Sequence, residues 1–382
     1  MRVGIDARFV TRYPRRGIGT YSLNLIAELV KVDRTIEYVL YIDRPDVEGI
    51  LPKAVNVRVR RLRMPLYPLW EQVALPLAAI HDRLDILHCL GNTAPLALPA
   101  HVRRVLSLMD VMFLQSGEFI PKPTTAYQRA GRLYRSLVAP RNARASDAVI
   151  TISEFSRCDI VRLIPNLAAD QVEVTHLDCD PTFSDQAAAP SPLGEARQPF
   201  ILCLGAEDPR KNTQRAVRAY LGAVRKYGIR ENLIVSGYAN WERSAAYREV
   251  QLADASQRVK FLGFVSINEL AQLYSEATLF LYPSLYEGFG IPMLEAFASG
   301  CPVVASRVTS MPEVGGEAAL YVDPNDENDI EQAIVRLVAD ISLRQHLVDR
   351  GHARRKEFGW ALTASKTLDI YRRITSDQGP AK

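Results

Sequence analysis

Two carboxylates and two glycines stand close together in the second half of the sequence. The segment EGFGIPMLE begins at Glu287, ends at Glu295 and contains Gly288 and Gly290. A carboxylate can accept hydrogen bonds from neighbouring hydroxyl groups, and glycine lets a ligand approach the backbone closely. These residue types in this order indicate a site for a ligand with many hydroxyl groups, such as a sugar.

A helix is expected after these glycines, because Pro292 suits its first turn and Gly300 suits the residue beyond its end. We predict this helix over about 292–299. The N–H groups of the preceding loop, together with the helix dipole, favour an anion or a polar ring. Glu295 is expected in the first helical turn, where a simple complement to the dipole is the alternative interpretation.

A pair of cations follows another predicted strand of the same half. In the segment CLGAEDPRKN, Arg210 and Lys211 stand where an amphipathic helix is expected to begin. Positive charge opposes the dipole at the start of a helix, so the pair indicates an anionic ligand nearby. Two solvated basic side chains on a loop are the alternative.

The elements that position these residues alternate between strands and helices along the chain. Helices are expected over 21–31 and 155–164, and the expected strands are RVGIDA, EYVLYID, DILHCLG, VRRVLSLMD, DAVITIS, VEVTHL, PFILCLG, ENLIVSG, VKFLGF, ATLFLYPS and CPVVAS. Runs of Val, Ile and Leu predict parallel sheets covered by helices on both faces. Ligands of such sheets bind beyond the carboxyl ends of the strands, where the loops described above begin.

With 382 residues, the chain has about twice the length of a typical domain. We predict two doubly wound α/β domains that face each other across a cleft. The first covers 1–184, a linker rich in Ala, Pro and Ser covers 185–198, and the second covers 199–361. A C-terminal helix over about 362–378 is expected to pack back on the first domain.

Composition indicates an ordinary globular protein that works in the cytoplasm. The five cysteines are scattered and form neither a CxxC pair nor a disulfide framework, which favours a reducing compartment. No run of about 18 apolar residues is present to span a bilayer. The opening segment MRVGIDARFV contains Asp6 and Arg8, and we interpret it as a first strand and not a signal peptide.

The positive charge is concentrated in the first half. Residues 1–150 contain 22 Lys and Arg against 13 Asp and Glu. Arginines alternate with aromatic residues over 58–70, and Arg129, Arg132 and Arg135 follow one face of an expected helix. This pattern indicates that the protein binds an anionic membrane surface. The alternative is a solvated helix face and an exposed strand without a partner. The arginines do not form a recognisable nucleic-acid-binding module, so no nucleic-acid partner is expected.

Two short motifs invite other interpretations. Gly17 and Gly19 follow the first strand, but the dinucleotide motif GxGxxG would require glycine where Ser22 stands, which argues against a dehydrogenase. Asp178 and Asp180 form an Asp-x-Asp triplet of the kind that binds a divalent metal in some enzymes. We interpret the triplet as structural and expect no metal cofactor.

The order of motifs along the chain resembles the family 4 retaining glycosyltransferases of the GT-B fold. The resemblance is carried by GIGTYSLNL, VITISEFSRCDI, LGAEDPRKN, the segment from VKFLGF to CPVVAS, and MPEVGGEAALYVDP. The resemblance is strongest over 199–325. The segments GIGTY and YPSLYEGFGIP are most similar to those of bacterial mannosyltransferases of surface polysaccharide synthesis. The resemblance implies a hexosyltransferase that uses a nucleotide-sugar donor.

The resemblance also implies roles for individual residues. Catalytic roles fall to Glu287 at the hydroxyls of the transferred sugar and to Lys211 and Arg210 at the diphosphate, and Asp110 is the one residue we name as general base. The implied donor-binding residues are Glu295 at the ribose, Gly288, Phe289, Gly290, Ile291, Gly17, Gly19 and Gly205, with Gly263 to Val265 facing the base. The sequence departs from the family pattern at two positions. Met109 stands where many relatives have a histidine, which concerns the acceptor side of the site. Ala206 stands close to where many relatives have an arginine, which concerns the diphosphate.

The implied reaction is transfer of mannose from GDP-mannose to a lipid-linked saccharide during polysaccharide synthesis, such as that of lipopolysaccharide. The enzyme is then expected on the inner face of the cytoplasmic membrane as a peripheral protein. Two alternatives remain at this stage: a sugar-nucleotide 2-epimerase of the same architecture, and a nucleotide-sugar-binding protein without turnover.

Overall fold

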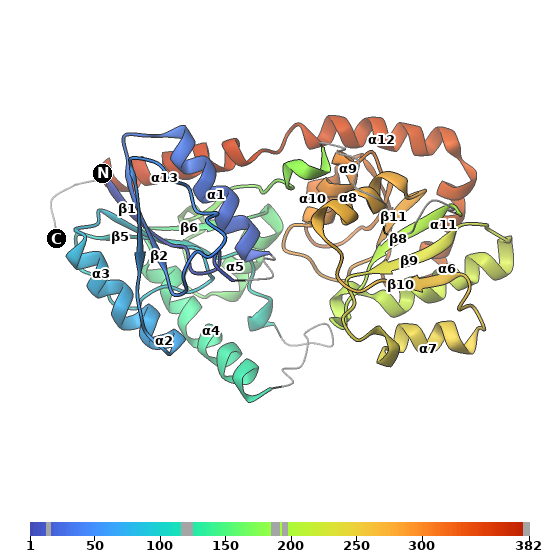
Figure 1. Ribbon diagram of the computed structural model, residues 1–382, viewed down its shortest axis with the longest axis horizontal. Coiled ribbons are helices and arrows are strands. Elements are labelled where there is room, and N and C mark those ends of the chain that lie inside the picture. Colours follow the sequence, from blue (N-terminus) through green and yellow to red (C-terminus); the bar gives the residue numbers. More distant parts are fainter. Residues whose placement is uncertain (13–16, 116–124, 185–191, 193–197, 377–382) are drawn as a thin grey trace. The chain divides into compact units, whose positions relative to one another are not determined.

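The computed structural model describes residues 1–12, 17–115, 125–184, 192 and 198–376, which form two compact units (Figure 1). Unit 1 contains the described residues within Met1–Gln115, Pro123–Leu177 and Gly359–Lys382, and unit 2 contains those within Asp178–Phe358. Each unit has a parallel sheet with helices on both faces, so the prediction of two doubly wound domains is confirmed. Apart from residues 192 and 198, the predicted linker lies outside the described residues.

The described part of unit 1 contains a seven-stranded parallel sheet in the order β3-β2-β1-β4-β5-β6-β7. Its strands are β1 Arg2–Asp6, β2 Glu37–Ile42, β3 Val57–Arg61, β4 Ile86–Cys89, β5 Arg103–Ser107, β6 Ala148–Thr151 and β7 Val172–Val174. Its helices are α1 Ile18–Val32, α2 Tyr67–Leu69, α3 Leu75–His81, α4 Ala126–Ala145, α5 Glu154–Leu163 and α13 Trp360–Ser376. A π-helical turn, Trp70–Ala74, joins α2 to α3, so that 67–81 is one run of helical turns.

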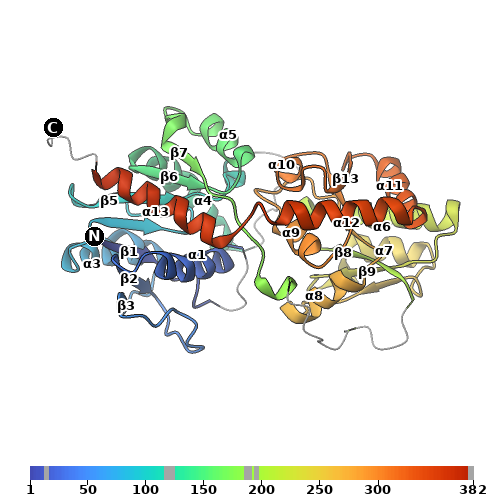
Figure 2. The same ribbon diagram turned by 90° about the horizontal axis from the view of Figure 1, so that it is seen from above.

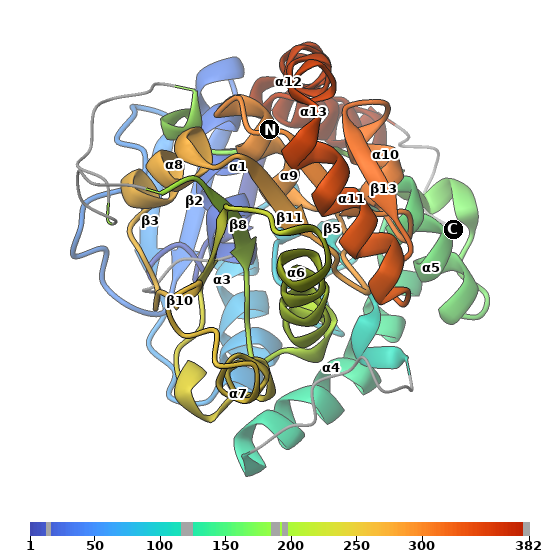
Figure 3. The same ribbon diagram turned by 90° about the vertical axis from the view of Figure 1, so that its right-hand side faces the viewer.

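The described part of unit 2 contains a six-stranded parallel sheet in the order β10-β9-β8-β11-β12-β13. Its strands are β8 Phe200–Leu204, β9 Asn232–Ser236, β10 Val259–Phe261, β11 Leu279–Tyr282, β12 Val303–Ser306 and β13 Ala319–Val322. Its helices are α6 Thr213–Tyr227, α7 Ala245–Leu252, α8 Ile267–Glu276, α9 Ile291–Ala298, α10 Met311–Gly315, α11 Glu327–Ala339 and α12 Ile341–Arg355. Figure 3 shows α6 and α7 on one side of this sheet and α8 and α9 on the other.

The core of each unit lies between its sheet and its helices. Every residue of β4, β6, β11 and β12 is buried, as expected for strands covered on both faces. Helix α6 directs Ala216, Val217, Tyr220 and Ala223 into the core of unit 2, at the spacing of one helix face. No helix in the described residues is long and apolar enough to cross a bilayer.

The C-terminal helix α13 belongs to unit 1, where it lies beside α1 (Figure 2). The Tyr21 and Trp360 rings are 6.3 Å apart. The hydroxyl of Tyr371 lies 2.5 Å from Nδ1 of the buried His88 on β4. Burial lowers the pKa of His88 to about 3, so this ring is neutral and forms a structural contact.

Strand β13 is missing from the strands expected from sequence, and β3 corresponds to the exposed strand that is the alternative interpretation of residues 58–70. Along β3, Arg58, Val59 and Arg61 are exposed, because it is an edge strand and lacks the apolar run that marks a central one. The helix predicted over about 292–299 is α9, Ile291–Ala298.

Candidate active site

The loops after β8 and β11 lie where the strand order of unit 2 reverses. The two strands are parallel neighbours, and the chain continues from them toward opposite edges of the sheet. Ligands of doubly wound sheets bind in the crevice that forms at such a point. The backbone N–H of Leu285 donates to the carbonyl of Arg210 over 2.7 Å, which joins the two loops directly.

Lys211 and Glu287 form an ion pair between these loops. The distance between Lys211 Nζ and Glu287 Oε1 is 2.7 Å, and the two side chains are only 22% and 14% exposed. Lys211 also donates to the hydroxyl of Tyr282, the last residue of β11, over 3.3 Å. Burial opposes ionisation of Glu287, but the ammonium of Lys211, together with the guanidinium of Arg210 and a hydrogen bond from Tyr282, outweighs it and holds the pKa of the carboxyl below its ordinary value. The structure therefore places an ammonium and a carboxylate side by side at the switch point.

Arg210 takes a different position from Lys211. Its guanidinium donates to Asp208 Oδ2 over 2.8 and 2.5 Å, and the other oxygen of Asp208 accepts the backbone N–H of Arg210. Both cations stand in the 3-10 turn Pro209–Lys211 before α6, and not in the first turn of that helix as predicted. The cationic pair expected from sequence is therefore balanced by two carboxylates, Asp208 and Glu287.

The glycine-containing loop enters α9 through a left-handed backbone. Gly290 has φ of +105°, a conformation that residues with a side chain rarely adopt. Phe289 is buried, with its ring 5.9 Å from that of Phe358, and Ile291 is the first residue of α9. Together with Gly288, these residues form the connection between Glu287 and the amino end of α9.

Sequence reasoning missed a pair of residues that hold this loop. The buried hydroxyl of Ser310 lies 2.9 Å from the carbonyl oxygen of Glu287 and 2.8 Å from that of Phe289, and shares its one hydrogen between them. The hydroxyl of Thr309, a residue with φ of +60°, accepts the backbone N–H of Glu287 over 3.4 Å. Both residues lie more than twenty positions along the chain, and an isolated Thr-Ser pair gives no sequence signal for this role.

Asn212 is a second residue that sequence reasoning missed. It has a left-handed backbone, with φ of +55°, and is buried. Its side-chain amide donates to the carbonyls of Pro283 (2.9 Å) and Pro324 (2.7 Å). Asn212 thereby fixes the turn that carries Lys211 to the loop that follows β11.

Glu295 lies in the second turn of α9 and not in the first, so the alternative role as a complement to the dipole loses its basis. Desolvation raises the pKa of its carboxyl to about 7, although Tyr274 donates a hydrogen bond to Oε2 over 3.2 Å and Lys211 also favours ionisation. The side chain is half-buried. This carboxylate can therefore change its charge near neutral pH.

The other donor-binding candidates of unit 2 follow the ends of neighbouring strands. Gly205 comes directly after β8, and a Cβ there would lie 2.5 Å from Val235 Cγ1, so that only glycine fits. Gly263 and Val265 follow β10, the edge strand, and the carbonyl of Gly263 accepts the N–H of Gly237 over 3.0 Å. They therefore share the carboxyl edge of the sheet with Lys211.

The remaining candidates belong to unit 1. Gly17 precedes α1 with φ of +46°, and Gly19 is buried in the first turn of α1. Met109 follows β5 and is buried, with its N–H donated to the side chain of Asn92 over 2.8 Å. Asp110 accepts the N–H of Met112 over 3.1 Å.

The aspartates of the Asp-x-Asp triplet contact protein groups. Asp178 pairs with Arg355 over 3.1 Å, and Asp180 accepts the N–H of Thr182 over 2.9 Å at the start of a 3-10 turn. These contacts favour the structural interpretation of the triplet.

Comparison with known proteins places this geometry in a family. A model of the family "Glycosyl transferases group 1" matches residues 198–340, which include the whole Lys211–Glu287 site. The chain is 33% identical over 381 residues to the O-antigen chain mannosyltransferase B of Escherichia coli, and the match covers 94% of this chain and 97% of that relative. The chain belongs to the group 1 glycosyltransferases.

Other relatives and solved structures agree with this assignment. The O-antigen chain mannosyltransferase RfbU of Salmonella typhimurium is 38% identical over 138 residues, which are 36% of this glycosyltransferase and 38% of that protein. A sucrose-phosphate synthase from Thermosynechococcus elongatus superposes with a TM-score of 0.73 at 20% identity, covering 98% of this chain and 99% of that one. WaaG, a glycosyltransferase involved in lipopolysaccharide biosynthesis, gives a TM-score of 0.69 at 13% identity, with 97% and 99% covered. These likenesses show the GT-B fold.

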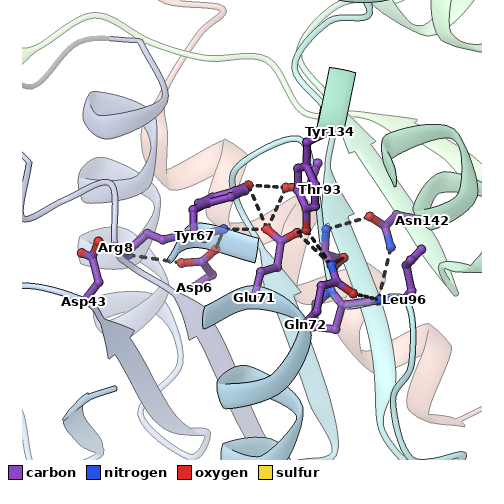
Figure 4. Close-up of polar contacts among 12 residues, drawn as sticks. Asp6, Arg8, Asp43, Tyr67, Glu71, Gln72, Thr93, Leu96, Tyr134 and Asn142 are labelled. Carbon is purple, nitrogen blue, oxygen red and sulfur yellow. Dashed lines mark hydrogen bonds and ion pairs between the residues drawn. The ribbon is translucent and has the colours of Figure 1, made fainter. Parts of the chain in front are cut away.

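Unit 1 of this glycosyltransferase contains a buried polar network at its own switch point, between β1 and β4 (Figure 4). Arg8 lies 2.7 Å from Asp6 and 2.8 Å from Glu71, and all three side chains are at most 1% exposed. The guanidinium carbon of Arg8 is 4.3 Å from the ring centre of Tyr67. Glu71 also accepts hydrogen bonds from three hydroxyl groups, those of Tyr67, Thr93 and Tyr134. The guanidinium of Arg8 therefore forms ion pairs with two buried carboxylates.

Substitution of Ser310 by alanine tests the role of the loop contact. The carbonyls of Glu287 and Phe289 would lose their donor, which costs about 1–2 kcal/mol in a buried site. Because the loop then holds Glu287 less firmly, we expect roughly a tenfold loss in kcat/KM. Ser299→Ala is the matched control, since that buried hydroxyl also donates to a backbone carbonyl, of Phe183, at 3.3 Å. Steady-state kinetics in which both variants lose activity equally would contradict a specific role for Ser310.

Proposed function

We propose that this enzyme transfers mannose from GDP-mannose to a lipid-linked saccharide in polysaccharide biosynthesis. The observation that carries the proposal is the Lys211–Glu287 ion pair at the switch point of unit 2. It offers a cation for the diphosphate and a carboxylate for the sugar hydroxyls. The relative from Escherichia coli is named an O-antigen chain mannosyltransferase, which supports mannose as the sugar.

In the proposed reaction, the bond between the anomeric carbon and the β-phosphate oxygen breaks and a bond from the acceptor oxygen to that carbon forms. Lys211 stabilises the negative charge that develops on the departing diphosphate, and Glu287 orients the sugar through its hydroxyls. The acceptor proton passes to the departing phosphate or to Asp110. Attack on the face that the diphosphate leaves retains the anomeric configuration and needs neither a covalent intermediate nor a metal ion.

A transfer assay tests the proposal. The purified enzyme is incubated with GDP-mannose, or with nucleotide sugars that carry glucose, N-acetylglucosamine or rhamnose, with and without a lipid-linked saccharide fraction. The expected result is release of GDP that depends on both GDP-mannose and acceptor, persists with EDTA and yields an α-linked product by NMR. Release without acceptor, together with an isomerised free sugar, would instead establish a 2-epimerase. A trapped glycosyl-enzyme adduct would exclude the proposed single displacement.

The pKa of Glu295 predicts how donor binding depends on pH. Because desolvation raises this pKa to about 7, the carboxyl is mostly neutral below neutral pH and mostly ionised above it. The ionised form accepts hydrogen bonds from the ribose hydroxyls more strongly, so KM for GDP-mannose is expected to fall severalfold between about pH 6 and pH 8. In Glu295→Gln, KM should be higher and flat over this interval. A variant that keeps the full pH dependence would rule out Glu295 as its source.

We also propose that the enzyme works as a peripheral protein on the inner face of the cytoplasmic membrane. A lipid-linked acceptor presents its reactive end at that surface. The concentration of arginines in residues 1–150 supports contact with anionic lipid.

A further inference from the structure

One buried asparagine of unit 1 has an amide nitrogen without a protein partner. Asn92 lies in the loop that follows β4, at the switch point between β1 and β4, and is only 8% exposed. Its Oδ1 accepts the backbone N–H of Met109 over 2.8 Å. Its Nδ2 has no hydrogen-bond partner among the described residues, and solvent reaches it. Two N–H groups are therefore available to a bound molecule.

The other two buried asparagines in the described part of the chain use their amide nitrogens within the protein. Asn142 of α4 donates to the carbonyl of Pro95 over 3.2 Å and accepts the N–H of Ala94 over 2.9 Å (Figure 4). Asn212 donates to two carbonyls of unit 2. Buried donors are nearly always paired, because an unpaired donor costs free energy. The exception at Asn92 points to a hydrogen-bond acceptor that comes from outside the chain.

The backbone holds this amide in a fixed place. A Cβ at Gly91 would lie 2.2 Å from Phe9 Cε2, so a side chain there would displace the ring. Asn92 has a left-handed backbone, with φ of +65°, and its N–H donates to the carbonyl of Ser107 over 3.1 Å. The carboxamide is planar and its oxygen is already bonded to the N–H of Met109. The N–H2 group of Asn92 therefore has one orientation.

This amide lies beside the loop that carries Asp110. Met109, which contacts Asn92, directly precedes Asp110. In the proposed reaction, Asp110 can take the proton of the acceptor, and the switch point of unit 2 takes the donor. The switch point of unit 1 is then left for the acceptor saccharide, since ligands of doubly wound sheets bind at such points. Sugar hydroxyls accept hydrogen bonds from an N–H2 group.

We propose that Nδ2 of Asn92 donates a hydrogen bond to a non-reacting hydroxyl of the terminal acceptor sugar and thereby determines which of the other hydroxyls reacts. The reacting oxygen must offer a lone pair to the anomeric carbon, so a hydrogen-bond donor is better directed at a neighbouring hydroxyl. With that neighbour held in place, one linkage is formed. The inference deepens the proposed function and rests on it, because it names the group that selects the linkage.

Substitution of Asn92 by glycine tests this role, because glycine keeps the left-handed backbone and removes the amide. The enzyme is assayed with the lipid-linked saccharide fraction, and NMR identifies the linkage in the product. The unmodified enzyme should form one linkage. N92G should raise KM for the acceptor about tenfold, leave KM for GDP-mannose within about twofold and form a second linkage. A single linkage in the product of N92G, or equal rises in both KM values, would overturn the proposal.

Synthetic acceptors show whether Asn92 and one hydroxyl act as a pair. The probes are octyl α-mannoside and analogues in which one hydroxyl at a time is replaced by hydrogen or fluorine. The unmodified enzyme should use one deoxy analogue about tenfold less well than the parent, and N92G should use the two equally. N92D keeps an oxygen for Met109 but cannot donate, so it should reject the fluorine analogue at that position more strongly. If N92G keeps the discrimination of the unmodified enzyme, Asn92 does not contact that hydroxyl.

Asn142→Ala is the matched control. It removes another buried amide that supports the same loop, through the N–H of Ala94. We expect a lower melting temperature, while KM for the acceptor and the single linkage stay unchanged. If N142A also forms a second linkage, the firmness of the loop selects the hydroxyl, and a contact from Asn92 does not.

Failure of this inference and failure of the proposed function give different results. If the donor sugar is not mannose, the linkage analysis is made with the donor that the enzyme uses, and the role of Asn92 is decided in the same way. If the enzyme isomerises its donor without an acceptor, the proposed function fails and this inference fails with it. If N92G transfers mannose and keeps the single linkage, only the role of Asn92 is wrong.

Discussion

Replacement of Lys211 by methionine should reduce the transfer rate by about two to three orders of magnitude. A preorganised cation aimed at a developing negative charge is worth roughly this much in a partly water-excluded site. The substitution also removes the counter-ion of Glu287, so the pKa of that buried carboxyl should rise. Both effects act on the transition state, and kcat should therefore fall more than KM rises.

The measurement is the acceptor-dependent release of nucleotide diphosphate, with Arg210→Gln as the control. The guanidinium of Arg210 already donates to Asp208, so its loss should cost much less, about tenfold or below. Equal losses for the two variants would mean that the ion pair between the loops has no special part in the reaction. Thermal unfolding of both variants shows whether the fold is retained.

The second large effect concerns stability. Arg8→Met should lower the free energy of unfolding of unit 1 by about 3–5 kcal/mol, because it leaves Asp6 and Glu71 buried without their cation. Burial already raises the pKa of Asp6 despite the neighbouring guanidinium, which shows how costly charge is in this network. The loss should be largest at alkaline pH, where Asp6 cannot take up a proton.

Urea unfolding followed by tryptophan emission measures this loss, since Trp70 lies beside Arg8, with 4.5 Å between the guanidinium carbon and the ring centre. Arg12→Gln is the control. Arg12 pairs with Asp43 over 2.8 Å, but 36% of its side chain is exposed, so its loss should cost less than about 1 kcal/mol. If the two variants unfold at the same urea concentration, the buried network does not stabilise unit 1.

The Lys211–Glu287 site could be anticipated from sequence because local signals mark it. The apolar strands and Gly205 show where the loops begin. Pro292, in the first turn of α9, shows where the second loop ends. The carboxyl ends of parallel neighbours then meet at one edge of the sheet, which predicts their proximity. The placement of Glu295 was less accurate, because α9 begins one residue earlier than Pro292 suggests and puts the carboxylate in the second turn.

The supporting contacts could not be predicted, because they depend on tertiary packing. The hydroxyl of Ser310 reaches a carbonyl 23 positions away, and Arg8 reaches Glu71 across 63 positions. The segment 58–70 is interpreted from sequence through its arginines and aromatic residues, with an exposed strand as the alternative. Its end begins the run of helical turns from Tyr67, in which prolines occupy the second positions of α2 and α3, so that this run has no simple helical signature in the sequence.

The assignment of α13 to unit 1 has a consequence for biosynthesis. Every strand of unit 2 lies in one uninterrupted stretch, whereas unit 1 needs residues that precede unit 2 in the sequence and residues that follow it. During translation, the later-made half can therefore acquire its complete set of contacts first. Tyr371 and Trp360 reach their partners on β4 and α1 only after all of unit 2 has been synthesised. A chain truncated after Phe358 should accordingly protect its second half from proteases while leaving the first half susceptible.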